Sequence, residues 1–208
     1  MAGTADDGGA DRAPPRIPAS EPGEWNLYPQ DGANERGRYI AGLATSLVGL
    51  PSISRLTQQA PDDCTGLVRI LYWKVGVELM DGGAYPGENG VTAIYRRART
   101  AGALHLRAPQ PGDLAFFRET YDRNRDGLRN DGLTHVGLVE SVKDGNVTFL
   151  HRVSRGVVRS QLNLRRPRVQ RQNGTLLNDY LRRVEGGRRA YLTGELFAAY
   201  ASADRLRW

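Results

Sequence analysis

The stretch Asp62-Asp63-Cys64-Thr65-Gly66-Leu67-Val68 decides the fold, because it joins an irregular segment to an apolar run and holds the only cysteine of the chain. Pro51 and Pro61 disfavour a helix before it, whereas the apolar residues that continue to Trp73 predict a largely buried helix. Either aspartate would cap this helix. A thiol in the first helical turn lies near free N–H groups and the positive end of the helix dipole, which favour the thiolate.

Cys64 has two interpretations at this point. A single cysteine is often a small buried core residue without a chemical role. The alternative is a nucleophile, which needs a base, and the chain offers three histidines for that purpose, His105, His135 and His151. One cysteine excludes an internal disulfide and a structural zinc site built from several cysteines.

The length of 208 residues suits one domain with extensions. Residues 1–33 are rich in Gly, Ala, Pro and Asp and have almost nothing to bury, so they predict a disordered tether before one domain at residues 34–208. Of 29 basic residues only Lys74 and Lys143 are lysines, and the net charge is +6. Such charge suits a cell-wall polymer, and without a nucleic-acid motif we expect no nucleic-acid partner.

Membrane attachment has little support in the sequence. No apolar run approaches the ~18 to 20 residues of a membrane span. Residues 1–32 have neither the positive start nor the apolar core of a signal peptide. If Met1 replaces the processed end of a longer precursor, residues 1–33 suit the spacer of an exported or lipid-anchored protein; cytoplasmic synthesis is the alternative.

The order of predicted elements gives the fold class. Helical periodicity predicts helices at residues 34–48, 64–76 and 91–101. Alternation and turn residues then predict strands at residues 114–117, 135–142, 147–151 and 156–160. Helices followed by an antiparallel meander define an α+β fold. Residues 165–189 give no clear signal, and the spacing of Leu192, Leu196, Phe197 and Tyr200 predicts a closing amphipathic helix at residues 191–203.

His135 and His151 fall on the two strands joined by the turn after Val142. Both imidazoles can therefore emerge on one face at neighbouring positions. A thiol at a helix start, facing an imidazole that a further polar group orients, is the papain-like arrangement. His151 would be the orienting group, and His105 is expected to pack at a strand start without a catalytic role.

Four blocks of the chain resemble the NlpC family of papain-like cell-wall cysteine peptidases. Asp63-Cys64-Thr65-Gly66-Leu67-Val68 is similar to the family's nucleophile motif, and Pro111-Gly112-Asp113-Leu114-Ala115-Phe116-Phe117 to its first strand. His135-Val136-Gly137-Leu138-Val139 resembles the strand that carries the base, and Phe149-Leu150-His151 the strand that follows it. The blocks occur in the family's order, from about residue 39 to 163.

The resemblance implies roles for three residues. Cys64 would be the nucleophile, His135 the general base and His151 the orienting residue, with no cofactor required for the chemistry. Cys64 Sγ would lie within ~4 Å of a His135 ring nitrogen. The thiolate would attack an amide carbonyl, helix-start N–H groups would hold the oxyanion, and His135 would protonate the leaving amine. Pairing with an imidazolium would lower the thiol pKa.

The same resemblance implies a substrate, a peptidoglycan stem peptide cut between γ-linked D-glutamate and a diamino acid. The tyrosine and glycine pair that the family places upstream of the cysteine are absent from Leu50-Pro51-Ser52-Ile53-Ser54-Arg55-Leu56. The alternatives are therefore an N-acetylmuramoyl-L-alanine amidase or acyltransferase on this fold, and a non-catalytic cell-wall-binding module. We expect a monomer in the cell envelope or secreted; an effector exported without a signal peptide is the alternative.

Residues 122–131 form an acidic insertion with the D-x-N-x-D-G spacing of a calcium loop. Its candidate ligands for a structural Ca²⁺ are Asp122, Asn124, Asp126, Leu128 and Asp131. The bidentate glutamate of an EF-hand is missing, because position 12 is Leu133. The alternative is a solvated turn rich in charges.

Overall fold

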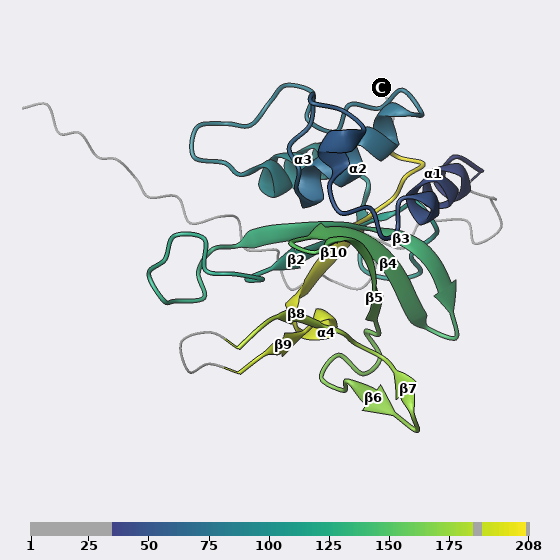
Figure 1. The fold of residues 1–208 in the computed structure, drawn as a ribbon, viewed down its shortest axis with the longest axis vertical. Helices are drawn as coiled ribbons and strands as arrows, with labels where there is room; N and C mark the ends of the chain where they lie inside the picture. Colours follow the sequence, from purple (N-terminus) through teal and green to yellow (C-terminus); the bar gives the residue numbers. More distant parts are fainter. Residues whose placement is uncertain (1–34, 185–188, 207–208) are drawn as a thin grey trace, which may run out of the picture.

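The computed structural model describes residues 35–184 and 189–206; the tether predicted at residues 1–33 lies outside them. It has the predicted α+β architecture, with three helices on one face of a mixed-length antiparallel sheet and short strands on the other (Figure 1). No helix within the described ranges is long and apolar enough to cross a membrane.

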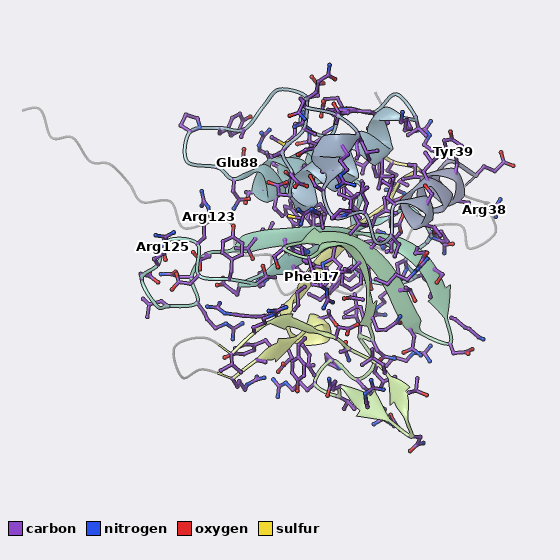
Figure 2. The ribbon with its side chains drawn as sticks, in the orientation of Figure 1. Arg38, Tyr39, Glu88, Phe117, Arg123 and Arg125 are labelled. Atoms are coloured by element: carbon purple, nitrogen blue, oxygen red, sulfur yellow. The ribbon has the colours of Figure 1, made fainter. Side chains whose placement is uncertain are left out.

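The helices of the first half begin and end near their predicted positions. They are α1 (Glu35–Ser46), α2 (Cys64–Trp73) and α3 (Gly90–Thr100), with a short 3-10 helix η1 (Ile53–Arg55) before α2. α1 ends before Gly49, whose φ of 87° suits glycine alone. Exposed Tyr39 and Arg38 point away from α1 in Figure 2, while its buried residues face the sheet.

The main sheet has six strands in the order β1-β10-β2-β3-β4-β5, all paired antiparallel. Strands β2 to β5 form the predicted meander, and β1 and β10 extend it. The bounds are β1 Leu104–His105, β2 Leu114–Arg118, β3 Leu133–Lys143, β4 Asn146–Val153, β5 Gly156–Leu162 and β10 Phe197–Ala201.

The helix predicted at residues 191–203 is wrong. This segment forms β9 (Tyr191–Leu192), one helical turn α4 (Thr193–Leu196) and β10, which lies between β1 and β2 in the sheet. In β10 Ala199 and Ala201 pack with the helices and Tyr200 packs on the opposite face. Pairing on both edges and burial on both faces outweigh the helical spacing of the apolar residues, because strand stability depends on neighbours distant in sequence.

The second face of the sheet is covered by the C-terminal part of the chain (Figure 1). Phe117 and Phe149 pack together there, with ring centroids 5.0 Å apart, in one cluster with Leu196 and the partly buried Leu181. Figure 2 shows Phe117 between the sheet and these C-terminal strands. The strands that arise from the unassigned region are β6 (Arg171–Gln172), β7 (Thr175–Leu176) and β8 (Tyr180–Arg182), with β8 paired to β9.

Candidate active site

Cys64 is the first residue of α2, and Asp63 caps the helix. The Asp63 carboxylate accepts hydrogen bonds from the backbone N–H groups of Thr65 (2.8 Å) and Gly66 (2.9 Å). The chain approaches the helix so closely that a Cβ on Gly66 would lie 1.8 Å from the Pro61 carbonyl oxygen. Cap and glycine together fix where the helix begins, and therefore where the thiol sits.

Asp62, the other predicted cap, has a different partner. Its carboxylate forms a bidentate pair with Arg152 of β4, at 2.9 Å for both hydrogen bonds. The Arg152 guanidinium lowers the pKa of Asp62 to about 2. Asp62 also accepts the backbone N–H of Ile53, at 3.0 Å. The segment before Cys64 is thereby attached to the strand that carries His151.

His135 and His151 form a buried hydrogen-bonded chain with Ser160. His135 Nε2 lies 2.8 Å from His151 Nδ1, and His151 Nε2 lies 3.0 Å from Ser160 Oγ. The three residues come from β3, β4 and β5. Along each strand their side chains alternate with side chains that pack against the helices. His151 also packs against Phe149, with ring centroids 4.9 Å apart. His135 therefore has a fixed ring orientation.

The hydrogen-bond chain determines which nitrogen of His135 can act as a base. If Ser160 Oγ accepts from His151 Nε2–H, His151 Nδ1 is left as an acceptor for His135 Nε2–H. His135 Nδ1 then carries the lone pair. This is the tautomer that an orienting residue provides for a catalytic imidazole.

Two cavities meet at His135. The first, of about 390 Å³, is lined by Cys64, Asp63, Thr134 and His135 together with Tyr121. The second, of about 570 Å³, is lined by His135, His151 and Ser160 and by residues 179–184 of the C-terminal region. The structure thus brings Cys64 and His135 to one cavity, and His135 and His151 into direct contact.

Burial controls the titration of these groups. It raises the pKa of the Cys64 thiol to about 12, against the weaker effect of nearby N–H groups that include that of Val136. Burial lowers the pKa of His135 to about 4. The pKa of His151 is also well below its usual range, through burial first and the charge of His135 second. The lowered thiol pKa expected from the sequence is therefore wrong.

Two residues of the site were not found from the sequence. Ser160 could have been found, because alternation along β5 places it on the same face as His151. Tyr121 could not, since it follows β2 in a loop whose path no local pattern specifies. The phenol of Tyr121 is about half exposed and lines both cavities; burial, and then the charge of Cys64, raise its pKa.

His105 lies in a separate buried cluster. Its Nε2 is 3.1 Å from the Asp113 carboxylate, and its Nδ1 is 2.8 Å from the Arg107 carbonyl oxygen. Asp113 also accepts the backbone N–H groups of Gln110 and Ala203. His105 ends β1 instead of starting a strand, and through Asp113 it is linked to the segment that follows β10.

The acidic loop follows β2 and projects from the molecule, with Arg123 and Arg125 outward (Figure 2). Its oxygens mainly accept internal hydrogen bonds: Asp122 from Gly127 N–H (2.7 Å), and Asp131 from Arg123 N–H (3.0 Å). One further oxygen each of Asp122 and Asp131 is buried without a partner. Among the described residues no group of three or more His, Cys, Asp or Glu is arranged to hold a metal. Calcium at Asp122, Asn124, Asp126, Leu128 and Asp131 stays a prediction.

Comparison with known proteins agrees with this site. Residues 56–152 match the family model of the CHAP domain, and Cys64, His135 and His151 all lie inside the match. No curated protein is significantly similar in sequence. The solved structures that are similar over part of the chain include NlpC2 and NlpC1 from Trichomonas vaginalis.

NlpC2 is 22% identical over 65% of this chain, with a TM-score of 0.41; NlpC1 is 24% identical over 64%, with a TM-score of 0.36. The chain spans 43% and 42% of their respective lengths. Both TM-scores lie below 0.5, so the assignment depends on the family match and on the site geometry.

A thiol at a capped helix start beside a buried, oriented imidazole defines a cysteine hydrolase of the papain-like class. The CHAP match over residues 56–152 supports the NlpC/papain-like cysteine peptidase family that the sequence resembles. The match supports a peptidase or amidase type of function directed at the cell wall. Catalysis of this kind requires no cofactor.

Proposed function

We propose that this chain hydrolyses amide bonds in peptidoglycan stem peptides, with Cys64 as nucleophile, His135 as general base and His151 as the residue that orients it. One observation supports this proposal above the others: the thiol and the anchored imidazole line one cavity at the start of α2. Ser160 extends the orienting chain by holding His151.

The first step is attack on the scissile carbonyl. His135 Nδ1 takes the proton from Cys64 as the sulfur–carbon bond forms. The Thr65 and Gly66 N–H groups already donate to Asp63, so the helix-start donor that we assign to the oxyanion is the backbone N–H of Cys64. Tyr121 lines the same cavity, and we assign to its phenol the substrate contact that the family's upstream tyrosine makes.

The second step is collapse of the tetrahedral intermediate. The carbon–nitrogen bond breaks, and the imidazolium of His135 gives its proton to the leaving amine. Water, deprotonated by the same imidazole, then attacks the thioester and releases the acid product with the thiol restored. Each proton that His135 receives is returned within the cycle.

The bond between γ-linked D-glutamate and a diamino acid is the one we propose, and the amide between N-acetylmuramic acid and L-alanine is the second candidate, since the CHAP match fits peptidases and amidases alike. Both substrates place the protein in the cell envelope or outside the cell.

Mass spectrometry of purified peptidoglycan tests the proposal. The parent protein should release fragments with a new amino terminus on the diamino acid, and Cys64→Ala should release none. Free stem peptides beginning with L-alanine would instead establish the amidase. Identical products from the parent and Cys64→Ala would contradict catalysis and favour a cell-wall-binding module.

A further inference from the structure

The second cavity adjoins His135 and is rich in arginine. Cys64 lines the first cavity but is not among the residues of the second, whereas His135 lines both. The described residues of the second cavity include four arginines and a single acidic side chain, Asp179; the arginines are Arg152, Arg155, Arg182 and Arg183. These lining residues give the second cavity a net positive charge.

Arg182 is the most informative of these arginines because it is buried, with 4% of its surface exposed. Its Nη1 donates to the backbone carbonyl oxygen of Glu119, at 2.9 Å. The Glu119 carboxylate itself accepts the N–H groups of Asp131 and Gly132. No carboxylate in the described parts of the chain forms an ion pair with Arg182. A buried cation without an anion is costly, and a ligand carboxylate would relieve that cost.

The other charged residues of the second cavity also favour a negatively charged ligand. Arg152 is already neutralised by Asp62, but Arg155 and Arg183 are exposed at the cavity and have no ion pair among the described residues. Arg155 lies close enough to His151 for its charge to affect that ring. Asp179 accepts the backbone N–H of Gln161, at 2.7 Å, and so has one oxygen engaged elsewhere. Three arginines thus face the cavity with one acidic side chain to balance them.

The role of His135 as proton donor indicates where the leaving half of the substrate binds. His135 protonates the leaving amine, so the leaving half of the substrate begins next to the His135 ring. The second cavity adjoins that ring, because His135 lines both cavities. We infer that it binds the leaving half of the substrate and that Arg182, with Arg155 and Arg183, binds a free carboxylate on that half. This inference rests on the proposed function.

Recognition of a free carboxylate would narrow the class of substrate. The substrate would carry its carboxylate on the leaving residue or the next one, as a diamino acid with a free carboxyl group or a short peptide with a free carboxyl terminus does. A long or amidated continuation would lose the ion pair. A guanidinium that meets a carboxylate with two parallel hydrogen bonds gives both affinity and orientation.

A binding experiment with Cys64→Ala tests the inference without turnover. The probes are L-lysyl-D-alanine and L-lysyl-D-alanine amide, which differ only at the terminal carboxylate, measured by calorimetry at low salt. We expect the acid to bind at least about tenfold more tightly than the amide. Adding Arg182→Gln should remove most of this preference. Equal affinity for the two probes, or binding of neither, would overturn the inference.

Matched variants separate recognition from folding. Arg155→Gln and Arg183→Gln change exposed residues of the cavity and should each reduce the acid preference even if Arg182→Gln fails to fold. Arg171→Gln removes the same charge from an exposed position of β6 and should leave the preference intact. A preference unchanged by both cavity variants would also contradict the inference. Failure of the proposed function would appear separately, as absence of peptidoglycan cleavage by the parent.

Discussion

Cys64 and His135 are both buried, and burial moves their pKa values apart, to about 12 and about 4. Transfer of the proton between groups with these values costs roughly 11 kcal/mol. At the ~4 Å separation expected from the sequence, attraction between the resulting charges returns about 4 kcal/mol at an effective dielectric constant of 20. The neutral pair is therefore the resting state of the two residues, and proton transfer accompanies attack on the substrate.

Alkylation of the thiol tests this conclusion, since Cys64 is the only cysteine and every label reports on it. The rate with iodoacetamide should rise continuously with pH through pH 9, because the reactive thiolate forms with a pKa raised to about 12. The same chain in denaturant should level off above its ordinary pKa of ~8.5. A rate that is already constant between pH 5 and 8 in the folded protein would reveal a preformed thiolate.

Stability should decline in mild acid. His135 is neutral when folded, with a pKa of about 4, and titrates near 6.5 when unfolded. Below pH 6.5 the unfolded chain binds more protons, so the free energy of unfolding falls by about 3 kcal/mol between pH 7 and 4. His151 acts in the same direction. Asp62, with a pKa of about 2, loses its contribution only below pH 4.

Urea unfolding at pH 7, 5.5 and 4.5 measures this effect. His135→Gln is the control, since it should show a distinctly smaller fall over the same range. A free energy of unfolding that stays level from pH 7 to 4.5 in the parent would contradict neutral, buried histidines.

At the scale of elements, the start of α2 depends on the approach of the chain before it. Gly66 has no room for a Cβ against the Pro61 carbonyl, whereas Gly42 of α1 has no heavy atom within 4 Å of the same position. The turn at Pro61 and the helix therefore form one packed unit that sets the place of the thiol.

Gly66→Ala should destabilise the protein by about 3 kcal/mol, because the helix must move away from Pro61. Gly42→Ala, also within a helix, should instead stabilise it by about 0.5 to 1 kcal/mol. Thermal unfolding of both variants checks the pair. Similar melting temperatures for the two would mean that the close approach at Gly66 does not constrain the helix.

The loop between β2 and β3 is the element in which calcium is predicted. If Ca²⁺ binds, the unpartnered oxygens of Asp122 and Asp131 become ligands of the ion. The melting temperature should then rise by a few degrees in millimolar Ca²⁺. Asp126→Ala should abolish the rise. No rise in the parent would leave the loop as a turn held by its own hydrogen bonds.

At the scale of the whole molecule, the Asp62–Arg152 pair joins the two sides of the site. It crosses from the segment before Cys64 to β4, and its bidentate geometry holds Cys64 and the histidines in register. Arg159 and Glu140 form another bidentate pair on the sheet, between residues that line neither site cavity. The two ion pairs have the same chemistry but different positions, so variants of one serve as controls for variants of the other.

Arg152→Ala should lower kcat on peptidoglycan fragments about tenfold, since small displacements of reacting groups are costly. Asp62→Ala should do the same, and the double variant should be no slower than either single one. Arg159→Ala should retain parental activity. Full activity of Arg152→Ala, or additive losses in the double variant, would show that the pair does not position the site.

The sequence by itself determined the helices, the strands β2 to β5 and the positions of Cys64, His135 and His151 on them. Caps, turns and periodicity act within a few residues, so they can be read without knowledge of the rest of the chain. The ordered motif blocks added the resemblance to the NlpC family.

Only the tertiary structure decided the remaining features. Phe197–Ala201 is a strand because β1 and β2, roughly 80 to 100 residues away in sequence, offer it two edges. The partner of Asp62, the place of Tyr121 and the burial of Arg182 likewise depend on contacts between distant segments. Burial also reversed the expected shift of the thiol pKa, because desolvation depends on everything packed around Cys64 and not on its helix alone.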